Sequence, residues 1–141
     1  MYPYGRDILV IDAETERRGR IARILAAEGF AVATAADPLS ALRTLSARRY
    51  ALVITTVELP GSVDGPAIVR RARRRLPALK ALYLTRTTRW PALADPDRED
   101  LLAMPFERWG LIGCTFELLE RERPSETADL ARRMRTERRV S

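Results

Sequence analysis

The sequence predicts a single α/β domain built on a doubly wound parallel sheet of five strands, with helices on both faces. Short apolar runs alternate along the chain with segments of helical periodicity. Several of these runs lack polar alternation, which is typical of strands covered on both faces. The chain has 141 residues, enough for one domain with a real core and too few for two ordinary domains.

The strands and the first helix follow from apolar spacing. The strand candidates are the runs near residues 7–11, 31–35, 51–56, 80–85 and 100–103. A helix is predicted near residues 14–28, because Ile21, Ile24 and Leu25 recur at helical spacing. Gly29 is a typical residue for the end of that helix.

Two further helices are predicted from their first residues. Asp37-Pro38 places an N-cap acceptor before a proline in the first turn, and Leu39, Leu42 and Leu45 then form an apolar stripe. Asp64 precedes a second helix of this kind, with Gly65-Pro66 in its first turn. The arginines at 70–75 are expected on its outward side.

The second half of the chain is less regular. Residues 87–100 contain Pro91, Pro96 and several charges, which argues against a full fourth helix. A clearer fifth helix is predicted from residue 107 to about residue 122. The expected organisation is an N-terminal extension at 1–5, one domain at 6–122 and a basic tail at 123–141 that includes a helix start near residue 125.

Composition excludes several classes of protein. No histidine is present, which removes the usual general base and the commonest metal ligand. One cysteine, Cys114, cannot close an internal disulfide or build a thiolate metal site. No apolar run approaches the ~20 residues of a membrane span, and residues 1–5 lack the features of a secretory signal. We therefore expect a cytoplasmic protein that is not an enzyme, has no catalytic residues, cofactor or metal, and does not contact a membrane.

The positive charge of the chain is concentrated in two places. The net charge is +6, and arginines cluster at 70–75 and again at 132–139. A basic surface attracts polyanions, so one alternative is a nucleic-acid-associated protein that uses the third helix and the tail. The other alternative is that the arginines at 70–75 simply form the solvent-exposed face of the third helix. Only Lys80 is a lysine, so the abundance of arginine also fits a genome-wide composition bias.

An ordered set of short motifs points to a known family. The set is Asp12 after the first strand, Leu59-Pro60-Gly61 and Asp64-Gly65 after the third, Thr85 after the fourth, and Pro105-Phe106 after the fifth. Together these motifs resemble the CheY-like receiver domain of bacterial response regulators, over roughly residues 6–122. The resemblance implies a flavodoxin-like sheet in the order 2-1-3-4-5, a site at the carboxyl ends of the strands, and a cis bond before Pro105.

The phosphorylation site of that family is degenerate here. The resemblance implies two acidic residues after the first strand, an acceptor Asp after the third, Mg²⁺ held by these acids, and a Lys before the Pro-Phe pair. This chain has Asp12-Ala13, Thr56 and Met104 at those places. A lone carboxylate holds Mg²⁺ poorly, a threonine without a base is a weak nucleophile, and methionine cannot offset developing charge. Phosphorylation by the family mechanism is therefore not expected.

A buried carboxylate without a cation is costly, which suggests a replacement for the missing metal. Arg86 directly follows Thr85, and we hypothesise that it covers the pocket and pairs with Asp12 or Glu58. The alternative is a solvent-facing Arg86 beside a hydrated Asp12. Two rival interpretations are a divalent-metal site made by Asp12, Glu14 and Glu58, and a small-molecule pocket near Asp12, Thr56 and Thr85.

If the site is inactive, the function depends on a binding surface, and the fifth helix offers a candidate. On the fifth helix, Ile112 lies next to the core-facing side, and Trp109 and Phe116 extend the apolar arc to about half of the circumference, wider than the usual stripe of just over 100°. The excess suggests a second contact, with a partner or with the chain's own tail. These residues are candidates for partner contact, unless they cap the edge of the core. The resemblance implies two-component (phosphorelay) signal transduction by a stand-alone pseudo-receiver. Its expected partner is a histidine kinase or another regulator, with a homodimer through this helix as a further expectation.

Overall fold

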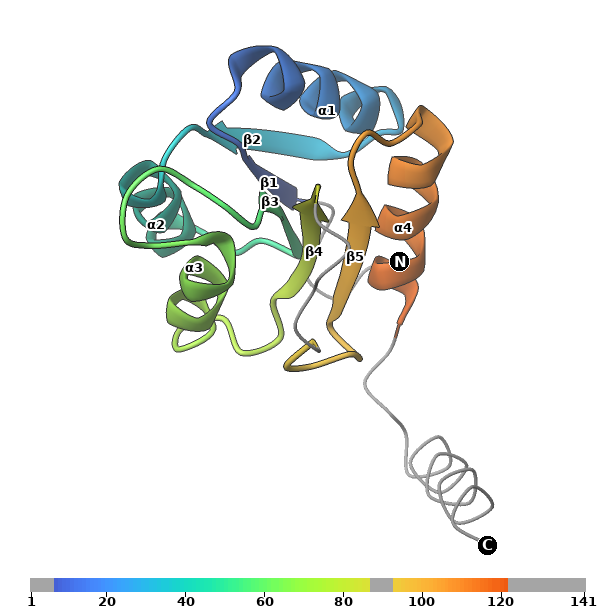
Figure 1. Cartoon of the computed structure of the whole chain (residues 1–141). Coiled ribbons are helices and arrows are strands. Elements are labelled where there is room, and N and C mark those ends of the chain that lie inside the picture. Colours follow the sequence, from blue (N-terminus) through green and yellow to red (C-terminus); the bar gives the residue numbers. More distant parts are fainter. Residues whose placement is uncertain (1–6, 87–92, 122–141) are drawn as a thin grey trace, which may run out of the picture.

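The computed structural model of the protein describes residues 7–86 and 93–121 (Figure 1). The predicted extension at 1–5 and the predicted tail at 123–141 lie outside the described residues. Five parallel strands form one sheet in the order β2-β1-β3-β4-β5. They are β1 (Asp7–Ile11), β2 (Ala31–Ala35), β3 (Leu52–Thr56), β4 (Lys80–Thr85) and β5 (Glu99–Ala103). The predicted fold class and strand order are confirmed.

Helices cover both faces of the sheet, as Figure 1 shows. The described part of the chain contains four: α1 (Thr15–Ala27), α2 (Pro38–Ala47), α3 (Gly65–Ala72) and α4 (Arg108–Glu120). The predicted fifth helix is α4. Between β4 and β5, residues 93–98 form no helix, in agreement with the proline-rich sequence there.

Alternation along the central strands divides the core into two layers. Ile8 and Val10 of β1 pack with Leu52 and Ile54 of β3 beneath α1 and α4. The alternate residues of β1 and β3, such as Leu9, face the other side of the sheet and pack beneath α2 and α3. Because both faces are covered, β3 is buried at all five positions, which explains its continuous apolar sequence.

The predicted caps of α2 and α3 are present. The Asp37 carboxylate accepts a hydrogen bond from the Ser40 backbone N–H at 2.8 Å, and Asp64 accepts one from Ala67 at 2.9 Å. Gly65 is required for a different reason. A Cβ atom there would lie 2.4 Å from the Thr56 carbonyl oxygen. The start of α3 can therefore press directly against the carboxyl end of β3, where the candidate site lies.

A buried polar cluster is centred on Glu99 of β5. Glu99 is buried and accepts hydrogen bonds from Arg73 Nη1 and the Tyr83 hydroxyl, both at 2.9 Å, and from the Asp95 backbone N–H at 3.0 Å. Burial and the adjacent Glu99 charge raise the pKa of Tyr83. The cluster joins the end of α3 to β4, β5 and the segment between these strands.

The single lysine also has a structural role. Lys80 Nζ donates hydrogen bonds to the carbonyl oxygens of Leu118 at 2.5 Å and Leu119 at 3.2 Å, and to that of Arg121. A cation is favourable at the negative end of a helix, so Lys80 caps α4 and fixes it to β4. Burial, and then the charge of Arg121, lowers the pKa of Lys80.

We predict that Glu99→Ala lowers the free energy of unfolding by about 3 kcal/mol, because it leaves the largely buried Arg73 guanidinium without its carboxylate. Urea unfolding followed by circular dichroism measures the loss. Glu117→Ala is the matched control, since Glu117 pairs with Arg121 at the exposed surface and should cost less than about 1 kcal/mol. Equal effects of the two substitutions would contradict the role assigned to Glu99.

Candidate functional site

The carboxyl ends of β1, β3 and β4 surround a cavity of about 600 Å³. The strand order reverses direction at β1 and β3, the place where ligands bind in open α/β sheets. Nine residues line the cavity: Glu14, Arg17, Thr56, Val57, Glu58, Leu84, Thr85, Arg86 and Met104. Five of the predicted site residues are thus brought together: Thr56, Glu58, Thr85, Arg86 and Met104.

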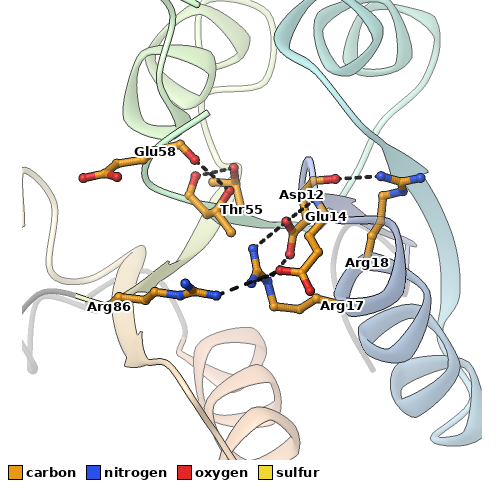
Figure 2. A network of polar contacts seen from close by, with 8 residues as sticks. Asp12, Glu14, Arg17, Arg18, Thr55, Glu58 and Arg86 are labelled. Carbon is orange, nitrogen blue, oxygen red and sulfur yellow. Dashed lines mark hydrogen bonds and ion pairs between the residues drawn. The ribbon is translucent and has the colours of Figure 1, made fainter. Parts of the chain in front are cut away.

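Asp12 is fully buried just after β1, and its carboxylate is already occupied (Figure 2). Arg17 Nε donates to Oδ2 at 2.5 Å, and Arg17 Nη2 donates to Oδ1 at 2.8 Å. The Glu14 backbone N–H donates to Oδ1 as well, at 2.9 Å. A bidentate guanidinium–carboxylate pair of this kind is among the strongest polar contacts in proteins. It raises the pKa of Arg17, chiefly through the hydrogen bonds to Asp12.

The beginning of α1 places Arg17 over Asp12. The helix starts at Thr15, so Arg17 lies in its first turn and its side chain reaches back to the end of β1. Arg17 Nη1 also donates to Glu14 Oε2 at 2.5 Å. The next residue, Arg18, donates to the backbone carbonyl of Asp12 at 2.8 Å. Two consecutive arginines therefore fix both the side chain and the main chain of Asp12.

The other degenerate positions contain no reactive group. Thr56 is almost buried, and its hydroxyl donates to the Glu58 carbonyl oxygen at 3.2 Å rather than to a base. Ala13 is exposed and supplies no oxygen ligand. Met104 packs against the apolar core, and the Met104–Pro105 bond is cis, as the resemblance implied. Thr85 is buried, and its carbonyl accepts a hydrogen bond from the Met104 backbone N–H at 2.7 Å.

The hypothesis that Arg86 pairs with Asp12 or Glu58 is wrong. Arg86 is 73 % exposed, and its Nη2 lies 3.9 Å from Glu14 Oε2. The Glu58 side chain points away from Asp12 in Figure 2. Arg17 pairs with Asp12 because it belongs to α1, the helix that begins beside Asp12. Arg86 follows β4 and lies at the rim of the cavity. The expected guanidinium is present, but it comes from α1.

The residues of the cavity do not fit the Mg²⁺ that the resemblance implies. Both oxygens of Asp12 already accept hydrogen bonds, and Ala13 and Thr56 provide no carboxylate. Within residues 7–86 and 93–121, no group of three acidic, histidine or cysteine side chains could hold a metal ion. This result also argues against the rival metal site at Asp12, Glu14 and Glu58.

The three residues predicted for partner contact on α4 have different environments. Ile112 is a core residue, and Phe116 packs on Phe30 with ring centroids 5.2 Å apart. Burial of Ile112 corrects its assignment as a partner contact, whereas Phe116 is half-buried and caps the edge of the core. Trp109 is 73 % exposed. In the part of the chain that is described, no helix is both long and apolar enough to cross a membrane.

Comparison with known proteins agrees with the fold. The family model for the response regulator receiver domain matches residues 8–103. The nitrogen assimilation regulatory protein NtrX of Azorhizobium caulinodans is 33 % identical over 82 residues, 57 % of this chain and 18 % of NtrX. The transcriptional regulatory protein TcrA of Mycobacterium tuberculosis is 35 % identical over 106 residues, 72 % of this chain and 41 % of TcrA.

A solved structure gives the same result. The response regulator receiver protein from Sinorhizobium medicae superposes with a TM-score of 0.74 at 26 % identity, covering 84 % of this chain and 98 % of that one. The chain spans less than a fifth of the length of the NtrX-type relatives it matches, and less than half of TcrA.

We predict that Arg17→Gln lowers the free energy of unfolding by about 2 kcal/mol, because the buried Asp12 carboxylate loses its cation. In a double-mutant cycle with Asp12→Asn, the coupling energy between the two residues should exceed about 1 kcal/mol. Arg18→Gln is the matched control, since it removes one hydrogen bond to a backbone carbonyl and should cost about 1 kcal/mol. Additive effects of Arg17→Gln and Asp12→Asn would show that the pair is not coupled.

Proposed function

The chain belongs to the response regulator receiver family of two-component signalling, and we propose that it works there without phosphorylation, through contact with another protein. The observation that carries the proposal is the Arg17–Asp12 pair. Phosphoryl transfer to a receiver requires an acceptor and cations around an in-line transition state. This cavity contains neither a carboxylate acceptor at Thr56 nor a cation at Met104.

The charge of the cavity also argues against a dormant phosphate site. Arg17 is the cation nearest to Asp12, and its guanidinium is fully engaged by Asp12 and Glu14. Its remaining capacity to stabilise an incoming phosphoryl group is therefore small. Arg86 lies at the rim, beside Glu14, and is largely exposed. A phosphoryl group at Thr56 would meet the Thr85 region and the apolar Met104 side chain, with no ammonium group to neutralise it.

Contact with a partner would then depend on a permanent surface. Trp109 lies in the first turn of α4, close to the end of β5, and its large exposed ring is of the type that anchors protein interfaces. By the family relationship, the proposed partner is a histidine kinase or another response regulator, and self-association through α4 is the second arrangement. The proposal places Trp109 at the centre of this contact.

We predict that the protein takes up no label from ³²P-acetyl phosphate or from a phosphorylated histidine kinase, because it lacks the acceptor and metal ligands. Intact-mass spectrometry should find no species heavier by one phosphoryl group. A phosphorylatable receiver treated in parallel is the positive control. Stable labelling of the wild-type chain would overturn the proposal.

Restoring the family's site residues, with and without Arg17, separates the effect of the missing residues on phosphorylation from the effect of Arg17. The triple variant Ala13→Asp/Thr56→Asp/Met104→Lys restores the acidic pair, the acceptor and the lysine. Since Arg17 still covers Asp12, this variant should label weakly. Adding Arg17→Met should raise labelling at least tenfold in the presence of Mg²⁺. Equal labelling of the triple and quadruple variants would show that Arg17 does not block the site.

We predict that Trp109→Ala reduces recovery of the signalling partner at least tenfold when tagged protein is used as bait in extracts of the native cell. Quantitative mass spectrometry of the captured histidine kinases and regulators measures the change. Leu39→Ala is the matched control, since Leu39 is also a large exposed apolar residue but lies on α2. Equal recovery with both variants would exclude Trp109 from the interface.

A further inference from the structure

Positive charge is segregated onto one face of the molecule. Helices α2 and α3 pack side by side on the same side of the sheet (Figure 1). The sequence has no aspartate or glutamate at residues 38–57 or 65–94, the stretches that contain these two helices. The same stretches contain a high density of arginines, including the cluster at 70–75.

Some of these arginines have structural roles. Arg73 pairs with Glu99, and Arg48 pairs with Asp7. Arg75 Nη1 donates to the carbonyl oxygen of Leu45 at 2.8 Å, which fixes the end of α3 against the end of α2. Internal contacts therefore account for these three residues.

Five others have no such explanation. We call them the arginine face: Arg43, Arg49, Arg70, Arg71 and Arg74, on or next to α2 and α3. All five are exposed, and none forms an ion pair with any described residue of the chain. Like charges held this close repel one another, so the face costs stability unless an anion binds to it.

A genome-wide preference for arginine does not explain the segregation. Such a bias would add arginine to every surface without removing acids from one of them. On the other side of the sheet, α1 and α4 also carry arginines, but acids lie in or next to both helices: Glu14, Glu16 and Glu28 at α1, and Glu107, Glu117 and Glu120 at α4. Arg17 pairs with Glu14, Arg108 lies 4.0 Å from Glu28, and Arg121 pairs with Glu117. The bodies of α2 and α3 therefore lack acids, and the nearest ones are the N-cap residues Asp37 and Asp64 at the first turns.

The composition of the face favours a phosphate backbone over a protein. Protein interfaces depend on buried aromatic or apolar anchors. Among the described residues, only Leu39 and Trp109 are large and exposed apolar side chains. Trp109 is on α4, and Leu39 lies in the first turn of α2, before all five arginines. Guanidinium groups match the oxygens of phosphate in bidentate geometry.

We propose that the arginine face binds the phosphate backbone of duplex DNA without reading its sequence. The ten residues of α2 span about 15 Å. Duplex DNA carries one charge per ~1.7 Å of axis, so a contact of this length faces about nine phosphate charges. Five arginines are enough to contact several of these at once. The proposed contact is independent of the Asp12 cavity.

The experiment is a fluorescence-anisotropy titration of a labelled 24-base-pair duplex with the full chain at 50–200 mM NaCl. The triple variant Arg70→Gln/Arg71→Gln/Arg74→Gln should bind at least tenfold more weakly at 50 mM NaCl. The slope of the logarithm of its binding constant against the logarithm of the salt concentration should be shallower by about 2.7, since each lost phosphate contact removes about 0.9 from that slope. The substituted side chains are exposed, so circular dichroism should find the fold unchanged.

Two comparisons complete the test. Arg132→Gln/Arg133→Gln/Arg135→Gln makes the same change in net charge at another place in the chain, and it should retain a larger share of the binding than the α3 variant. A greater loss in this variant, or no binding of the wild type at 50 mM NaCl, would overturn the proposal. Competition by poly-glutamate as effective as that by DNA would also overturn it, because the face would then recognise acidic protein.

Discussion

The pairing of Asp12 with Arg17 is the interaction on which the character of the site depends. A carboxylate that is fully buried at the end of β1 must have a cation or lose its charge. Arg17 supplies the cation from within the chain, and with two hydrogen bonds it satisfies both carboxylate oxygens. Because arginine stays protonated at any physiological pH, the pair is permanent in a way that a dissociable metal ion is not.

The fold could be predicted from the sequence because its signals are local. The apolar run of β3 and the caps at Asp37 and Asp64 each act within a few residues, and they agree with one another. The buried cluster around Glu99 was not predicted. In the sequence, Glu99 lies among charged residues that resemble a loop, and its partners Arg73 and Tyr83 come from other elements. Only tertiary packing reveals why a carboxylate is buried there.

Only part of the candidate site could be predicted from the sequence. The need for a guanidinium beside Asp12 follows from the cost of burying a lone charge, but Arg17 provides it and not the predicted Arg86. The choice between Arg17 and Arg86 depends on where α1 begins, since a helix start at Thr15 directs Arg17 back over β1. On α4, the wide apolar arc similarly has an internal explanation for Phe116. Its partner Phe30 lies far away in the sequence, after α1.

Under the proposed function, the cavity would have little means of responding to a small ligand. A ligand shifts a conformational equilibrium only by its difference in affinity for the two states. Here the polar groups that would detect phosphate or metal are already bound to one another. Recognition would then depend on permanent surfaces, with the exposed Trp109 on α4 and the arginine face on or next to α2 and α3, helices that cover opposite faces of the sheet. Signals conveyed through these surfaces would depend on how much protein and partner are present, and not on phosphorylation at the position of Thr56.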